Sequence, residues 1–160
     1  MSAMSDKLSA LGYRQLVEAD HYAPKTLANL SSIIGRPVPA PFTRFLEEFP
    51  NSGIFEQSVD VLGLEAAPGV PDKRYPISGM YANCSKSHLD IVKRHEGRLG
   101  IWSDFLIFGN DSIGNLFAID LRDSEFGKIK CKTSEEDWDG RLYLVASDFE
   151  SFILSLQSSD

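Results

Sequence analysis

The sequence predicts a single-domain α+β protein in which a curved, mostly antiparallel sheet is flanked by N-terminal helices and a C-terminal amphipathic helix. Apolar residues follow a helical period in the first third of the chain and again at its end, whereas short apolar or alternating segments fill the middle. Turns rich in Gly and Asn separate these segments and favour antiparallel neighbours. With 160 residues, 42% of them hydrophobic, the chain can build one genuine core.

The N-terminal part is expected to contain three helices. The first is a loose pattern that ends near Ala19, built on Leu8, Leu11, Leu16 and Val17. The second begins in the turn that contains Pro24 and ends at Gly35, with apolar residues at Leu27, Leu30, Ile33 and Ile34. The third begins at Pro41 and carries one apolar stripe, formed by Phe42, Phe45, Leu46 and Phe49.

The middle of the chain is expected to form strands around one central hairpin. Phe105–Phe108 is a continuous apolar run, Gly109–Ser112 can turn tightly, and an alternating segment follows from Leu116 to Leu121. Further strands are expected at 55–64, 77–82, 127–132 and 142–145, the third of them with lysines on one wet face. A short helix, capped by Ser87, is expected over His88–His95.

The last helix has the clearest local signal. Ser147 and Glu150 have the spacing of a capping box. An apolar stripe at helical spacing follows, formed by Phe149, Phe152, Ile153 and Leu156. One face of this helix should therefore pack on the sheet.

The order of these pieces resembles the SUKH superfamily, the Smi/Knr-type domain. The resemblance rests on three stretches: Val38-Pro39 through Phe45-Leu46 to Asn51-Ser52-Gly53, the Phe108–Asn115 hairpin turn, and Val145–Phe149 with Phe152. It covers roughly Leu27 to Leu156 and places a SUKH-like domain at 24–157 behind a helical extension at 1–23.

This resemblance implies a protein that acts by binding. Bacterial members of the superfamily look like immunity proteins, which bind and occlude a cognate secreted toxin, often a nuclease, so that the producing cell is spared. Fungal members instead act as regulatory or scaffolding proteins, so the same fold leaves a non-catalytic regulatory function as the alternative.

Charge indicates the kind of partner. Sixteen Lys and Arg stand against 23 Asp and Glu, a net charge of −7, which disfavours direct nucleic-acid binding and favours a basic protein such as a toxin. We therefore expect recognition by an acidic loop with an aromatic anchor, formed by Glu135, Glu136, Asp137, Trp138 and Asp139. The alternative is a solvated turn, which charge runs commonly form.

Asp111, at the tip of the central hairpin, is a further candidate contact, although Asp is also common in turns for backbone reasons. No catalytic residue, metal site or cofactor is expected. Cys84, His88 and His95 lack the further ligands of a zinc site. Two cysteines and the absence of a long apolar segment fit a cytoplasmic protein without membrane contact. We expect a monomer or a weak homodimer.

Overall fold

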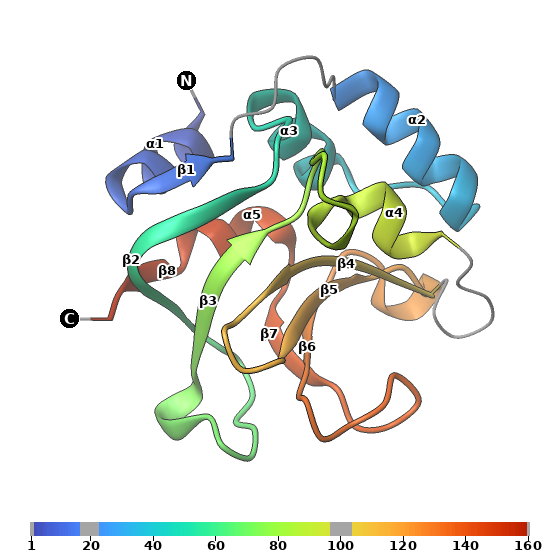
Figure 1. Ribbon diagram of the computed structural model, residues 1–160. Coiled ribbons are helices and arrows are strands. Elements are labelled where there is room, and N and C mark those ends of the chain that lie inside the picture. Colours follow the sequence, from blue (N-terminus) through green and yellow to red (C-terminus); the bar gives the residue numbers. More distant parts are fainter. Residues whose placement is uncertain (1, 17–22, 97–103, 160) are drawn as a thin grey trace.

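The computed structural model describes residues 2–16, 23–96 and 104–159, which form a single α+β domain (Figure 1). Its α-helices are α1 (Ala3–Ala10), α2 (Ala23–Ile34), α3 (Ala40–Glu48), α4 (Ile91–His95) and α5 (Phe149–Leu154). Its strands are β1 (Tyr13–Gln15), β2 (Gly53–Leu62), β3 (Arg74–Met80), β4 (Phe105–Asn110), β5 (Leu116–Asp120), β6 (Ile129–Lys132), β7 (Tyr143–Ala146) and β8 (Leu156–Ser158).

These strands make one antiparallel sheet in the order β1-β2-β3-β4-β5-β6-β7, with β8 paired to β2 as well. β1 pairs with residues 53–55 of β2, and β8 pairs with residues 59–61 of β2. β3 pairs with β2 between Gly53 and Leu62. Between Ile54 and Val59 the register with β3 shifts by a bulge, a feature that bends a strand and increases its twist.

The sheet curves so far that the segment after β2 reaches β7. Glu65 follows β2 and donates its amide to the Leu144 carbonyl of β7 at 2.9 Å, while its side chain accepts from the Leu144 amide at 2.6 Å. Glu65 thus satisfies the outer edge of β7 as a neighbouring strand would. The predicted curved antiparallel sheet is confirmed, and it remains open.

The main core lies where α3 and α5 cover one face of the sheet. Aromatic rings dominate it, with ring centroids about 5 to 6 Å apart. Three close contacts are edge to face: Phe42 to Phe149 at 5.0 Å, Phe108 to Phe149 at 5.1 Å and Phe108 to Phe152 at 5.2 Å. Such pairs add roughly 0.5–1.5 kcal/mol each beyond area burial. The apolar stripes predicted for these two helices are therefore the ones that hold them to the sheet.

β3 pairs with β4 only at Gly79–Met80, so the rest of that β4 edge needs another partner. His95 of α4 supplies it, because its Nε2 accepts from the Ile107 amide at 2.9 Å. Its Nδ1 lies 2.7 Å from the Ile91 carbonyl, which only accepts, so Nδ1 carries the proton. His95 is thus a buried histidine with a structural role in the sheet.

The second and third predicted helices are confirmed, and Gly35, with φ of +73°, ends the second as expected. The first is wrong in extent. It ends at Ala10, Gly12 turns the chain with φ of +73°, and a strand follows at Tyr13. The part expected at Val17 to Ala19 lies outside the described residues.

Both predicted helix caps are wrong by a few residues. Asp90 caps α4 in place of Ser87, and Asp148 caps α5 in place of Ser147 by accepting from the Ser151 amide at 2.7 Å. Leu156 begins β8 instead of ending the last helix. A carboxylate follows each predicted cap, three residues on at Asp90 and one residue on at Asp148, and its negative charge is favourable at a helix N-terminus.

Candidate functional site

Three connections meet beside the ends of β4, β5 and β6: the β2–β3 loop (63–73), the hairpin tip (111–115) and the acidic loop (133–140), as Figure 1 shows in the lower half of the molecule. A hollow of about 220 Å³ lies between them. It is lined by residues of all three segments and by Tyr143 of β7: Pro68, Gly69, Ile113, Asn115, Thr133, Ser134, Glu135, Glu136 and Tyr143. The structure thus brings the predicted acidic loop and hairpin tip together.

The hairpin tip is rigidly built. Asp111 Oδ1 accepts from the amides of Ile113 and Asn115, both at 2.9 Å, and Gly114 provides the positive φ of +100° that the turn needs. Asn115 Oδ1 then accepts from the Ser134 amide at 2.9 Å, which ties the tip to the acidic loop. Ile113 projects from this frame with 68% of its surface exposed.

Asp111 has a structural role in this turn. Only 3% of its surface is exposed, and one of its oxygens accepts from two backbone amides of the turn. A contact between Asp111 and a partner stays a prediction.

Trp138, the predicted aromatic anchor, is buried within the protein. It is 2% exposed, and its ring stacks on Phe105 with centroids 5.0 Å apart. A contact between Trp138 and a partner stays a prediction. Lys132 Nζ lies 5.8 Å from the same ring. Because Phe105 projects from the sheet face opposite α3 and α5, that face needs an apolar cover, and the acidic loop folds back to supply Trp138. The residue is a structural plug.

The carboxylates of the acidic loop remain as candidates. Glu135, Asp137 and Asp139 are exposed and Glu136 is half-buried. Within the described part of the chain, none of these four forms an ion pair with a Lys, Arg or His. Their role in binding a partner stays a prediction.

The two basic residues that flank the acidic loop in sequence, Lys132 and Arg141, are engaged by other groups of the protein. Lys132 Nζ donates to the carbonyls of Thr133 and Glu136, at 3.2 and 2.7 Å. Arg141 pairs with Glu65 at 2.6 Å. The negative charge of the acidic loop is therefore left available to an outside group.

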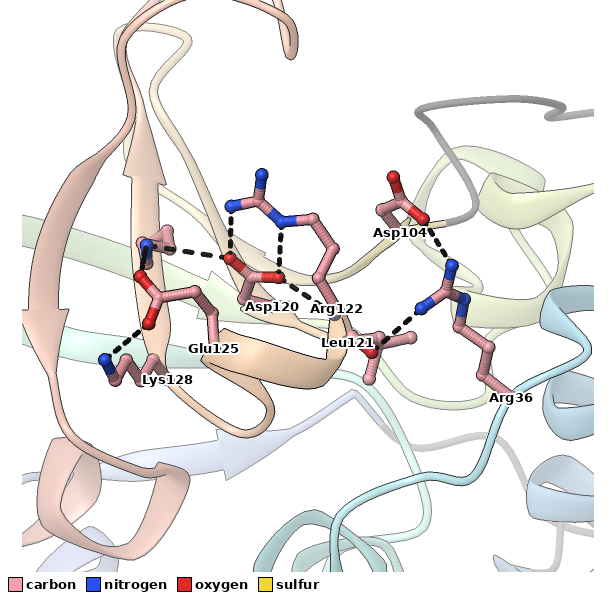
Figure 2. Close-up of polar contacts among 8 residues, drawn as sticks. Arg36, Asp104, Asp120, Leu121, Arg122, Glu125 and Lys128 are labelled. Atoms are coloured by element: carbon pink, nitrogen blue, oxygen red, sulfur yellow. Dashed lines mark hydrogen bonds and ion pairs between the residues drawn. The ribbon is translucent and has the colours of Figure 1, made fainter.

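A second charged group on these strands was not predicted at all. It surrounds Asp120, and we call it the Asp120 cluster: Asp120, Arg122, Glu125, Lys128 and Lys130 (Figure 2). Asp120 is fully buried and accepts two side-chain bonds from Arg122, at 3.0 and 2.7 Å. Lys130 Nζ lies 3.6 Å from Asp120 and 3.1 Å from Glu125.

The electrostatics of this cluster favour its charged forms. The hydrogen bond to Asp120 raises the pKa of Arg122, and bonds from Lys128 and Lys130 lower the pKa of Glu125 to about 2. The wet face expected for the strand at 127–132 is wrong at Lys130, which is buried beside Asp120 and Glu125. The available sequence signal was Asp120 at the end of an apolar strand with Arg122 two residues on.

A further ion pair fastens the helices to this side of the sheet. Arg36, between α2 and α3, donates to Asp104 at 2.6 Å and to the Leu121 carbonyl at 3.0 Å (Figure 2). Arg36 therefore connects the helical layer to the strands that carry the Asp120 cluster.

The described residues include no group of three or more His, Cys, Asp or Glu side chains suited to hold a metal ion. Both cysteines are buried free thiols, and burial raises the pKa of Cys131 to about 12. Among the same residues, no helix has the length and apolar character needed to cross a bilayer.

Comparison with known proteins places the chain in context. The family model described as the SMI1/KNR4 family (SUKH-1) matches residues 23–155, which is most of the chain. No curated protein matches it in sequence.

Proposed function

The chain belongs to the SMI1/KNR4 family (SUKH-1), and we propose that it is an immunity protein that binds and occludes a cognate secreted bacterial toxin. The proposed toxin is basic, as a nuclease would be, and the proposed place of action is the cytoplasm of the cell that needs protection. The resemblance to bacterial members of the superfamily motivates this proposal.

The observation that carries the proposal is the uncompensated charge of the acidic loop. Four carboxylates on one short loop lack a cationic partner among the described residues, in a chain of net charge −7. A basic active-site surface would be drawn to them over a distance of about 10 Å at moderate salt. The exposed Ile113 and the hollow beside it add an apolar contact within the same area.

The mechanism that fits this arrangement is occlusion without chemistry. Two of the reactive side chains serve the fold: Cys131 is a buried thiol of high pKa, and His95 uses both ring nitrogens in backbone hydrogen bonds. Bound acidic residues would set the association rate and the choice of partner, while a few desolvated contacts would set the lifetime of the complex.

The direct test is capture of the partner. Tagged protein is incubated with lysate of its own source cell, and bound proteins are identified by mass spectrometry and checked for a 1:1 complex. Recovery of the toxic domain of a secreted protein, together with cell survival when both are co-expressed, is the expected result. Recovery of cellular regulatory or biosynthetic proteins instead, with no protection, would replace immunity by a regulatory or scaffolding function.

A further inference from the structure

We propose that the cleft between α2 and α4 binds a small zwitterion of the α-amino acid class. The cleft lies among the helices in the upper part of Figure 1 and shares no lining residue with the hollow beside the acidic loop, so the inference does not depend on the proposed function. It is supported by the size of the cleft, by the buried polar side chains of its floor, by a buried carboxylate among them and by two lysines at its rim.

The cleft has the size of a small metabolite and preformed walls. Its volume of about 280 Å³ is just below the roughly 300–1,000 Å³ of pockets that enclose drug-sized molecules. Residues of α2, of the segment 83–85 and of α4 with its N-cap line it. The Thr26 hydroxyl donates to Asn83 Oδ1 and ties α2 to this segment, and Asp90 accepts from the Cys84 amide at 2.8 Å. Walls held in this way reduce the entropy lost when a ligand is ordered.

The floor of the cleft is polar, although its residues are buried. Thr26, Asn83 and Asp90 all line the cleft, and each is at most 8% exposed. Thr26 uses its single O–H on Asn83, and the Asn83 amide group donates to the Pro50 carbonyl at 2.7 Å. The Thr26 oxygen and the Asp90 carboxylate retain lone pairs. The floor therefore offers mainly acceptors, which suit a ligand group that donates hydrogen bonds.

Asp90 adds a buried negative charge to this floor. Its Oδ1 accepts from the Cys84 amide at 2.8 Å and its Oδ2 from the Lys93 amide at 3.0 Å, which leaves each oxygen able to accept again. Within the described part of the chain, Asp90 forms no ion pair. An ammonium group in the cleft would bring both hydrogen-bond donors and the opposite charge to this carboxylate.

The rim of the cleft carries positive charge. Lys25 on α2 is exposed and is in no ion pair among the described residues, and Lys93 on α4 pairs with Glu96 at 3.4 Å. Because both side chains of that pair are about half exposed, the pair is weak and Lys93 can exchange its partner. Two lysines repel a ligand that is only cationic, whereas a carboxylate attracts them. An α-amino acid carries the ammonium and the carboxylate on one carbon atom and so fits both the floor and the rim.

The test uses L-valine as the probe, because Val92 and Cys84 add an apolar part to the lining. Two controls each lack one charged group of valine: 3-methylbutanoate lacks the ammonium, and 2-methylpropylamine lacks the carboxylate. Each compound is titrated into the ¹⁵N-labelled full chain at neutral pH, and amide chemical shifts are followed. We expect valine to shift the amides of Cys84 and Lys93 with a Kd of about 1 mM or tighter, and each control to bind about tenfold more weakly.

Three variants assign the two charged groups to their partners. Asp90→Asn removes the charge of the floor and keeps an acceptor that caps α4 equally well. Lys25→Gln removes a cation of the rim, and Lys7→Gln, outside the lining and in no ion pair of the described chain, is its control of equal charge. Asp90→Asn and Lys25→Gln should each weaken valine binding about fivefold or more, and Lys7→Gln less than about twofold.

The two site variants should also change selectivity in different ways. Asp90→Asn should reduce the advantage of valine over 3-methylbutanoate, and Lys25→Gln its advantage over 2-methylpropylamine. The amide spectrum of each variant reports whether it is folded, and the exposed Lys25 provides a test that does not disturb the buried floor.

Equal binding of valine and either control, or equal effects of Lys25→Gln and Lys7→Gln, would overturn the inference. Absence of saturation by about 10 mM valine would do the same. Each of these results would leave immunity standing, because the probe needs no toxin. Failure to capture a toxin would likewise leave the cleft unaffected.

Discussion

The Asp120 cluster surrounds the connection from β5 to β6, the acidic loop follows β6, and the two regions use charge in opposite ways. In the cluster, the buried Asp120 meets Arg122 and Lys130, and Glu125 meets two lysines. In the acidic loop, four carboxylates face solvent or the hollow without a cation of the described chain. Charge that is compensated builds the fold, and charge left uncompensated is available for a partner.

The same contrast applies to the aromatic residue of the acidic loop. Trp138 stacks on Phe105. The Cζ atom of the Arg122 guanidinium also lies 5.0 Å from the centroid of the Phe105 ring. The loop therefore has a buried apolar base and an acidic outer surface. This division predicts that substitutions at the base will change stability and that substitutions at the surface will change binding.

The largest expected effect is that of Trp138→Ala. Removing a buried ring that stacks on Phe105 should lower the free energy of unfolding by about 4 kcal/mol, in the range for large aromatic residues replaced by alanine. Urea unfolding monitored by circular dichroism measures it. Asp139→Ala, on the exposed surface of the same loop, is the matched control and should stay within about 0.5 kcal/mol. A similarly small loss for Trp138→Ala would mean that the ring is not a plug.

Asp120→Ala comes next, because it leaves Lys130 buried without its central partner. Breaking a buried pair from one side costs roughly 3–5 kcal/mol, and the partial exposure of Arg122 places the expected loss near 3 kcal/mol. The same unfolding experiment measures it. Asp123→Ala, exposed and only three residues away, provides the control. Equal stability of the two variants would show that the cluster does not hold the strands.

Charge reversal of the acidic loop should leave stability nearly unchanged and alter binding. Replacing Glu135, Glu136 and Asp137 with lysine removes no ion pair of the described chain, so the free energy of unfolding should move by about 0.5 kcal/mol or less. Association with a captured basic partner should slow about tenfold or more at low salt, and less at high salt. Stopped-flow or surface plasmon resonance measures the rate.

The control for charge reversal carries an equal change in net charge elsewhere. Asp6, Glu47 and Asp123 are exposed and lie in no ion pair among the described residues, so their replacement by lysine tests the effect of net charge alone. If this control slows association as much as the loop variant does, the acidic loop is not the docking surface.

The elements predicted correctly from the sequence are those that depend on residues close together in the chain. Apolar spacing and Gly35 define α2, and the Gly-rich turn defines the central hairpin, because both depend on residues close together in the chain. Sequence reasoning missed the Asp120 cluster, since Asp120 and Lys130 become neighbours only through the pairing of β5 with β6. Likewise, the sequence shows Trp138 among four carboxylates, but not that the loop folds back onto Phe105.

The smallest expected effect is on how the unfolding free energy depends on pH at acidic values. It refines the contrast between the Asp120 cluster and the acidic loop. Hydrogen bonds from Lys128 and Lys130 hold the pKa of Glu125 near 2, below its ordinary value of 4.5. The folded state therefore binds this proton less readily than the unfolded state does. The stabilising contribution of ionised Glu125 is present above about pH 4.5 and is lost as the pH falls towards 2.

Glu125→Gln should therefore flatten the dependence of unfolding free energy on pH between 4.5 and 2, because glutamine has no carboxylate to bind a proton in this range. The carboxylate it replaces accepts from two lysines in the folded state. Urea unfolding of the parent chain and the variant at several pH values measures both slopes. If the two slopes are equal, the ion pairs of Glu125 do not stabilise the fold, and the distinction between structural and available charge fails in the Asp120 cluster.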